Sequence, residues 1–151
     1  MNSVLPVRKP RPLTLFSATL CAGVFLVLLS ACSSDAVVKL KDNTRLSDIA
    51  INLNGAAIES RPDMVEVCKG FILSRSQIIE YYAHSTLVDD KTAYLKHNIL
   101  PCYAAGSAVI NDSRYKWKIY AGGIGEFTSD SKRFLKVCGK DCCQKMPDVC
   151  Q

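Results

Sequence analysis

The sequence predicts an α+β domain in which a small antiparallel sheet of four or five strands packs against one main helix and is braced by disulfides. Three observations support this fold class. Several short segments alternate apolar and polar residues, as strands with one buried face do. One segment carries a complete helix-start signal, and six cysteines follow residue 32. No strand–helix–strand alternation is visible, so a parallel sheet is not expected.

Two strands are expected in the first half of the domain. Arg45–Ala57 contains Ile49, Ile51 and Leu53 in strict alternation, which is typical of a half-buried strand. Asn54-Gly55 is expected to form a turn. Met64–Leu73 is apolar and rich in β-branched residues, so it predicts a second strand.

The main helix is expected to begin after Ser74. Ser74-Arg75-Ser76-Gln77 has the capping-box spacing, in which the hydroxyl and the amide each satisfy a free backbone group at the helix start. Apolar residues then continue to about Ser85. Asp89-Asp90-Lys91 indicates the start of a shorter helix or an irregular connection.

The second half of the domain has a β pattern. Cys102–Ile110 and Tyr115–Tyr120 flank four polar residues, 111–114, which predicts a hairpin with a four-residue turn. A glycine-rich turn follows at residues 121–125. Phe134–Cys138 is expected to be the last strand.

The N-terminal segment has the layout of an export signal. Residues 1–12 hold three basic side chains and no acidic one, and residues 13–30 are uncharged and largely apolar. The apolar run ends in Leu29-Ser30-Ala31-Cys32, which resembles the bacterial lipobox, where signal peptidase cuts before a lipid-modified cysteine. Cleavage between Ala31 and Cys32 and lipidation of Cys32 are therefore expected. The alternatives are a retained transmembrane helix and an ordinary cleaved signal.

These features divide the chain into a signal peptide (1–31), a lipidated tether (32–42) and a single α+β domain with a Cys-rich C-terminal tail (43–151). Cleavage leaves 120 of the 151 residues and lowers the formal net charge from +5 to +2, because three basic residues are removed. This excludes a strongly basic nucleic-acid-binding domain. Ser33, in place of aspartate, favours the periplasmic face of the outer membrane by the sorting pattern of enteric lipoproteins.

An even number of cysteines in an exported domain predicts three disulfides. The candidates are Cys68, Cys102, Cys138, Cys142, Cys143 and Cys150. Adjacent Cys142 and Cys143 are expected to bond to different partners, and the sequence leaves the remaining connectivities open. A redox centre or a metal site are the alternatives for the C-terminal cysteines, but the C-x-x-C spacing that both commonly use is absent. No metal or cofactor is expected.

The mature domain resembles a group of small, largely uncharacterised bacterial lipoproteins. The matching features span roughly residues 64–143. They are Phe71-Ile72-Leu73-Ser74, Pro101-Cys102-Tyr103-Ala104-Ala105-Gly106, Trp117 leading to Ala121-Gly122-Gly123-Ile124-Gly125, and Cys138 with Cys142-Cys143. This resemblance implies the fold and the compartment, and no activity.

Other polar patterns are interpreted as structural. Residues 122–125 lack the flanks of a phosphate loop. His84 and His97 do not have a metal-ligand spacing, and Asp89-Asp90 is typical of a solvated turn or helix start. No catalytic residue is predicted.

One face of the strand expected at Tyr115–Tyr120 could bind a ligand. In Tyr115–Tyr120, the residues Lys116, Lys118 and Tyr120 share one face, and the strand's remaining residues form the apolar face around Trp117. A basic and aromatic face suits an acidic ligand such as a lipid phosphate or a peptidoglycan carboxylate. The sequence alone nevertheless favours an ordinary exposed sheet face over a binding site.

The leading functional expectation is a non-enzymatic binding or structural module of the periplasm, anchored to the membrane by its N-terminal lipid, with an unknown envelope protein or cell-wall partner. An immunity or inhibitor lipoprotein that neutralises an envelope-targeting toxin or phage is the first alternative. A thiol-active or hydrolytic enzyme is the second.

Overall fold

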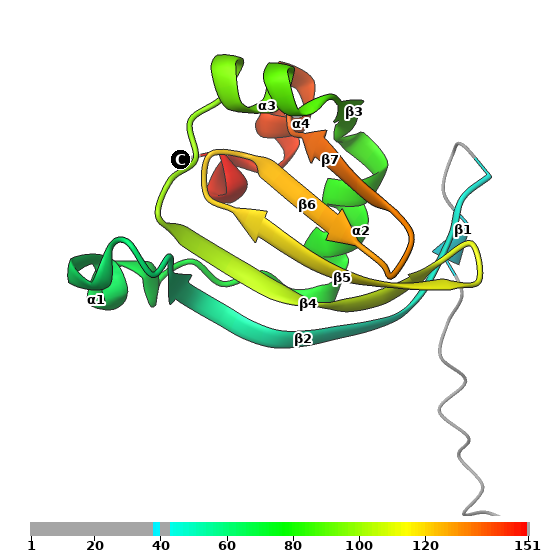
Figure 1. Ribbon diagram of the computed structural model, residues 1–151, viewed down its shortest axis with the longest axis horizontal. Coiled ribbons are helices and arrows are strands. Elements are labelled where there is room, and N and C mark those ends of the chain that lie inside the picture. The colour runs from blue at the N-terminus through cyan, green and yellow to red at the C-terminus, as the bar shows by residue number, and fades with distance from the viewer. Residues whose placement is uncertain (1–37, 40–42, 151) are drawn as a thin grey trace, which may run out of the picture. The chain divides into compact units, whose positions relative to one another are not determined.

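The computed structural model describes residues 38–39 and 43–150 (Figure 1). All of them belong to one compact unit. The expected signal peptide, Cys32 and most of the expected tether lie outside the described residues. Among the helices that are described, none combines the length and the apolar character needed to cross a bilayer.

The core of the fold is one antiparallel sheet of seven strands in the order β1-β2-β4-β5-β6-β7-β3. The strands are β1 (Val38–Lys39), β2 (Arg45–Ala57), β3 (Thr86–Val88), β4 (Cys102–Ile110), β5 (Ser113–Tyr120), β6 (Ile124–Thr128) and β7 (Arg133–Val137). The predicted α+β class and antiparallel sheet are confirmed, but the predicted number of strands is too low. β1 and β3 are too short to show an alternating pattern, and the start of β6 lies inside the expected glycine-rich turn.

Strand β2 runs through Asn54 and Gly55 to Ala57, so the turn expected there does not form, and the simple alternation before it is also wrong. Ile49 is buried, whereas Ile51 and Leu53 are 37% and 50% exposed. The pairing of β2 with β4 shifts register between Ser47 and Ala50, and at two later points. Each bulge adds an unpaired residue and turns the following side chains to a different direction.

The strand predicted at Met64–Leu73 does not form. A 3₁₀ helix (Pro62–Met64) leads into the short helix α1 (Val65–Cys68), and the chain beyond Gly70 is irregular. Asn54 of β2 holds this irregular segment, since its amide donates to Leu73 O and its Oδ1 accepts from Leu73 N, each at 3.1 Å. A short apolar run without alternation does not distinguish a strand from a buried helical turn.

Helix α2 (Arg75–His84) begins at the predicted capping box. The Ser74 hydroxyl accepts a hydrogen bond from Gln77 N, and the Gln77 side chain accepts one from Ser74 N. The helix packs its buried residues Ile78, Tyr81 and Tyr82 against the sheet. It is the longest helix but not the single one, because α1, α3 (Asp90–Lys96) and α4 (Lys140–Lys145) also form.

We expect Ser74→Ala to lower the free energy of unfolding by about 1 kcal/mol, because the first turn of α2 loses its side-chain acceptor. Urea unfolding followed by the fluorescence of the chain's single tryptophan would measure the change. Ser74→Asp is the matched control, since it restores an acceptor and should recover most of the loss. Equal losses in both variants would contradict a capping role.

The glycine-rich segment 122–125, which forms the turn after β5 and the start of β6, accommodates Tyr81. Gly122 and Gly123 have positive φ values of 91° and 86°, which glycine adopts without strain. A Cβ at Gly125 would lie 2.5 Å from Tyr81 Oη. The Tyr81 hydroxyl donates to Lys136 O at 2.8 Å, and burial raises the pKa of Tyr81 well above its usual value. The segment is therefore shaped for this buried tyrosine.

The β4–β5 hairpin has a tighter turn than predicted. Residues 111–114 were expected to form the loop, but β5 already begins at Ser113. Asn111 and Asp112 have φ values of 46° and 65°, as in the two-residue type I′ turn whose twist matches that of paired strands.

Three disulfides brace the fold, as predicted. They are Cys68–Cys102, Cys138–Cys142 and Cys143–Cys150. Adjacent Cys142 and Cys143 bond to different partners, which confirms that expectation. The first bond joins α1 to the start of β4, and the other two connect β7, α4 and the closing 3₁₀ helix (Pro147–Val149).

Candidate functional site

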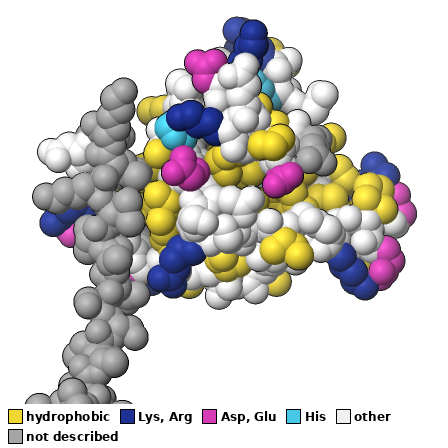
Figure 2. Space-filling view, turned by 180° about the vertical axis from the view of Figure 1, so that it is seen from behind, with side chains coloured by type: hydrophobic (Ala, Val, Ile, Leu, Met, Phe, Trp, Pro, Cys, Tyr) yellow, Lys and Arg dark blue, Asp and Glu magenta, His cyan; other side chains and the backbone are white. Residues whose placement is uncertain are grey.

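The two faces of the sheet are covered differently. Helix α2 lies behind the sheet in Figure 1, and Trp117 is buried on that side with Tyr81 and Phe127. Figure 2 shows this side from outside, with apolar and charged side chains interspersed over it. On the other face, α3 covers only the part formed by β6, β7 and β3, where Ala93 packs with Leu135. Of the helices in residues 43–150, none covers the face formed by β2, β4 and β5.

This uncovered region holds a shallow depression of about 610 Å³, which we call the open face. Its lining comes from four adjacent strands and consists of Asn52, Ala105, Gly106, Ser107, Lys116, Trp117, Lys118, Glu126 and Thr128. Cross-strand pairing orders the side chains into rows. Lys116 lies between Ser107 and Thr128, and Lys118 lies between Ala105 and Glu126.

Lys118 is held at the open face by two aromatic rings. Its Nζ lies 4.5 Å from the ring centroid of Tyr103 and 5.8 Å from that of Tyr120. The two tyrosine rings lie 5.9 Å apart. An ammonium group near an aromatic face is attracted by the ring quadrupole. Among the described residues, neither Lys118 nor Lys116 forms an ion pair with a carboxylate.

Tyr120 adds a hydroxyl donor at this position. Partial burial, together with the negative charge of Glu126, raises the pKa of Tyr120 to about 12. The hydroxyl therefore stays protonated at neutral pH. Together with Tyr103 and Tyr120, which adjoin it at Lys118, the open face offers two ammonium groups, a phenolic donor and two aromatic rings, which suits an anionic ligand with hydroxyl groups.

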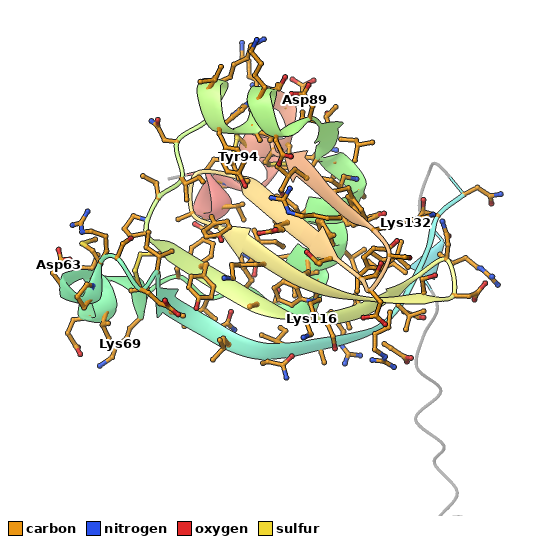
Figure 3. All side chains as sticks on the ribbon, viewed as in Figure 1. Asp63, Lys69, Asp89, Tyr94, Lys116 and Lys132 are labelled. Carbon is orange, nitrogen blue, oxygen red and sulfur yellow. A yellow bond between two sulfur atoms is a disulfide. The ribbon has the colours of Figure 1, made fainter. Side chains whose placement is uncertain are left out.

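Glu126, the acidic side chain of the open face, is hydrogen-bonded to Arg133. Glu126 accepts a hydrogen bond from Arg133 Nε at 2.5 Å, and Arg133 also binds Asp90 at 2.7 Å and Tyr94 Oη at 3.0 Å. The hydrogen bonds to Asp90 and then Glu126 raise the pKa of Arg133. Figure 3 shows Tyr94 on α3 and Lys116 on β5. This network connects α3 to the sheet and offsets part of the negative charge of Glu126, because the single Arg133 cation also binds Asp90.

The other polar residues singled out from the sequence have structural roles. Asp89 is the N-cap of α3, where its carboxylate accepts from Thr92 N at 2.8 Å, and this hydrogen bond lowers the pKa of Asp89. His84 is the last residue of α2, and its Nε2 lies 3.0 Å from Glu80 Oε2. His97 follows α3. Within the described residues, no cluster of metal-ligating side chains includes either histidine.

A second depression, of about 670 Å³, is lined mainly by apolar residues of α1 and of the segments around residues 72 and 100. Val67 and Ile72 are exposed there. It lies at the end of β2 opposite to β1 (Figure 1). Asp148 is the one charged residue among those that line it, so this depression defines a binding site less sharply than the open face does.

Sequence reasoning found part of the open face. The predicted separation of Lys116, Lys118 and Tyr120 from the buried face around Trp117 is confirmed. It missed Tyr103 and Glu126, which reach the same surface from the neighbouring strands. Their side chains could be placed only by the register of those strands, and alternation within β4 was the one available signal.

Comparison with known proteins found no family model, no curated protein and no solved structure that matches this chain.

Proposed function

We propose that this protein is a lipid-anchored binding module of the bacterial cell envelope whose open face binds the anionic cell wall. The observation that carries the proposal is the pair Lys116 and Lys118 on an uncovered sheet face, flanked by Tyr103 and Tyr120. The lipobox ending in Cys32 supports the anchor. Peptidoglycan supplies both the carboxylates and the hydroxyl-rich sugar rings that this combination of groups accepts.

The short segment between the lipidated cysteine and the folded domain supports this choice of ligand. Five residues separate Cys32 from Val38, where the sheet begins. Even fully extended, the six peptide steps span at most about 20 Å. The domain is therefore held next to the membrane surface, and a large polymer that lies along that surface can reach the open face.

Co-sedimentation with purified peptidoglycan sacculi tests the binding. We expect the wild-type protein to sediment with sacculi and the double variant Lys116→Ala/Lys118→Ala to lose at least about tenfold in affinity, because two ammonium–carboxylate contacts are removed. Binding of the wild type should weaken at high salt.

Lys69→Ala/Lys140→Ala is the matched control. It removes the same charge from two exposed positions that do not line the open face, the C-cap of α1, where Lys69 pairs with Glu66, and the start of α4. Equal binding by the two double variants, or no sedimentation of the wild type above a lipoprotein blank, would overturn the cell-wall proposal.

The anchor has its own test. We expect the wild-type protein to incorporate an alkyne-labelled fatty acid and to enter the detergent-soluble membrane fraction, because two or more acyl chains anchor stably. Cys32→Ser should remove the label and leave an uncleaved precursor, whereas Cys21→Ser should not. Labelling that persists in Cys32→Ser would overturn the lipidation site.

A further inference from the structure

The four C-terminal cysteines form one sulfur cluster, although they are joined as two disulfides. The Sγ atoms of Cys138, Cys143 and Cys150 all lie within 4.8 Å of one another. Cys138 belongs to the disulfide with Cys142, and the other two form the second disulfide. A sulfur of one disulfide is therefore next to both sulfurs of the other.

The two disulfides differ in exposure. Cys138 and Cys142 are only 3% and 2% exposed, whereas Cys143 and Cys150 are half-buried. Reduction by thiol exchange needs access of the attacking sulfur to the disulfide. An external reductant therefore reaches Cys143–Cys150 first.

The close approach depends on Gly123, in the turn before β6. A Cβ at this position would lie 3.1 Å from Cys138 Cβ and 3.4 Å from Cys150 Sγ. The absence of a side chain lets the end of β7 and the C-terminal segment meet. On the other side, Cys142 borders a depression of about 200 Å³ that is also lined by His84 and by the opposite charges of Lys140 and Asp141. The Lys140 cation favours a thiolate at Cys142, whereas the Asp141 carboxylate opposes it.

We propose that the C-terminal cysteines form a thiol–disulfide exchange site that passes reducing equivalents from an external dithiol, through Cys143–Cys150, to Cys138–Cys142. This goes beyond the proposed cell-wall binding and does not depend on it. In the first step, the dithiol reduces Cys143–Cys150 to two thiols and is itself oxidised to a disulfide. It thereby supplies the two electrons and the two protons.

The second step is internal. A thiolate of Cys143 or Cys150 attacks Cys138 Sγ, a new bond to Cys138 forms, and the Cys138–Cys142 bond breaks. Cys142 leaves as a thiolate and takes up the proton that the attacking thiol lost. The number of disulfides is unchanged in this step. The result is a free thiol at Cys142, beside Lys140, which the oxidised protein does not present.

Trapping after limited reduction tests the proposal. The purified full-length protein in detergent is treated with one equivalent of dithiothreitol, quenched with acid, alkylated and mapped by peptide mass spectrometry. We expect alkylated Cys142 together with a new disulfide from Cys138 to Cys143 or Cys150. Alkylation confined to Cys143 and Cys150, with Cys138–Cys142 intact at all times, would overturn the proposal.

The double variant Cys143→Ser/Cys150→Ser is the control, because it removes both internal attacking thiols. We expect its Cys138–Cys142 bond to be reduced at least about tenfold more slowly than in the wild type, since internal attack benefits from a high effective concentration. Equal rates would overturn the internal step, as would a wild-type exchange rate proportional to protein concentration. The Cys68–Cys102 bond, with Cys68 fully buried, reports in every sample that the fold is intact.

Discussion

The double variant Cys68→Ala/Cys102→Ala is expected to lose about 4 kcal/mol of unfolding free energy, because this bond closes a loop with a sequence separation of 34 residues. The bond restricts the unfolded chain over the whole of α2, β3 and α3. It also joins α1 to the start of β4, with a Cα–Cα distance of 4.9 Å, which is within the normal range for disulfides. Replacing both cysteines avoids a free thiol.

The matched control is Cys143→Ala/Cys150→Ala, whose bond spans a separation of only seven residues. It should cost about 2 kcal/mol, since the shorter loop restricts the unfolded chain less. Urea unfolding of both variants, followed by tryptophan fluorescence, gives the comparison. A larger loss for the C-terminal variant would show that native-state packing, rather than loop length, sets the effect.

Trp117→Ala is expected to cost about 3–5 kcal/mol, a large part of the roughly 5–15 kcal/mol typical of a domain. Trp117 is 2% exposed. Its ring lies against Gly106 of the neighbouring strand, where a Cβ would come within 2.6 Å of Trp117 Cζ2. No other side chain replaces this contact, so the substitution leaves a cavity between the sheet and α2. Far-UV circular dichroism would follow the unfolding, because the variant lacks the fluorescent residue.

Trp117→Phe separates packing from hydrogen bonding. Within the described residues, the indole N–H of Trp117 has no hydrogen-bond partner, so its removal should cost little. We expect the phenylalanine variant to lose clearly less stability than Trp117→Ala, because an aromatic ring still covers Gly106. Equal losses would contradict the claim that packing of the ring against Gly106 carries the effect.

Local patterns in the sequence predicted the elements whose signals are complete within a few residues. The capping box at Ser74 placed the start of α2, and the alternation around Trp117 placed the two faces of β5. The same reasoning failed where distant residues decide the outcome. Residues 64–73 have an apolar run that would suit a strand, but Asn54 and the Cys68–Cys102 bond hold them as a helical turn and an irregular segment.

The candidate site divides in the same way. Lys116, Lys118 and Tyr120 could be assigned to one face because side chains alternate along a single strand. Tyr103 and Glu126 could not, because their positions depend on the pairing of β4, β5 and β6. The absence of a covering helix is also a tertiary property, since it depends on where α2 and α3 pack.

By itself, the sequence determined the α+β class, the start of α2 and the two faces of β5. It also indicated an even number of cysteines in which Cys142 and Cys143 bond to different partners. The tertiary structure decided the strand order, the disulfide partners, the open face and the contact between the two C-terminal disulfides. The physical reason is the distance along the sequence over which each interaction acts. Capping and alternation act over two to four residues, whereas strand register, helix packing and the meeting of sulfurs join residues far apart in the chain.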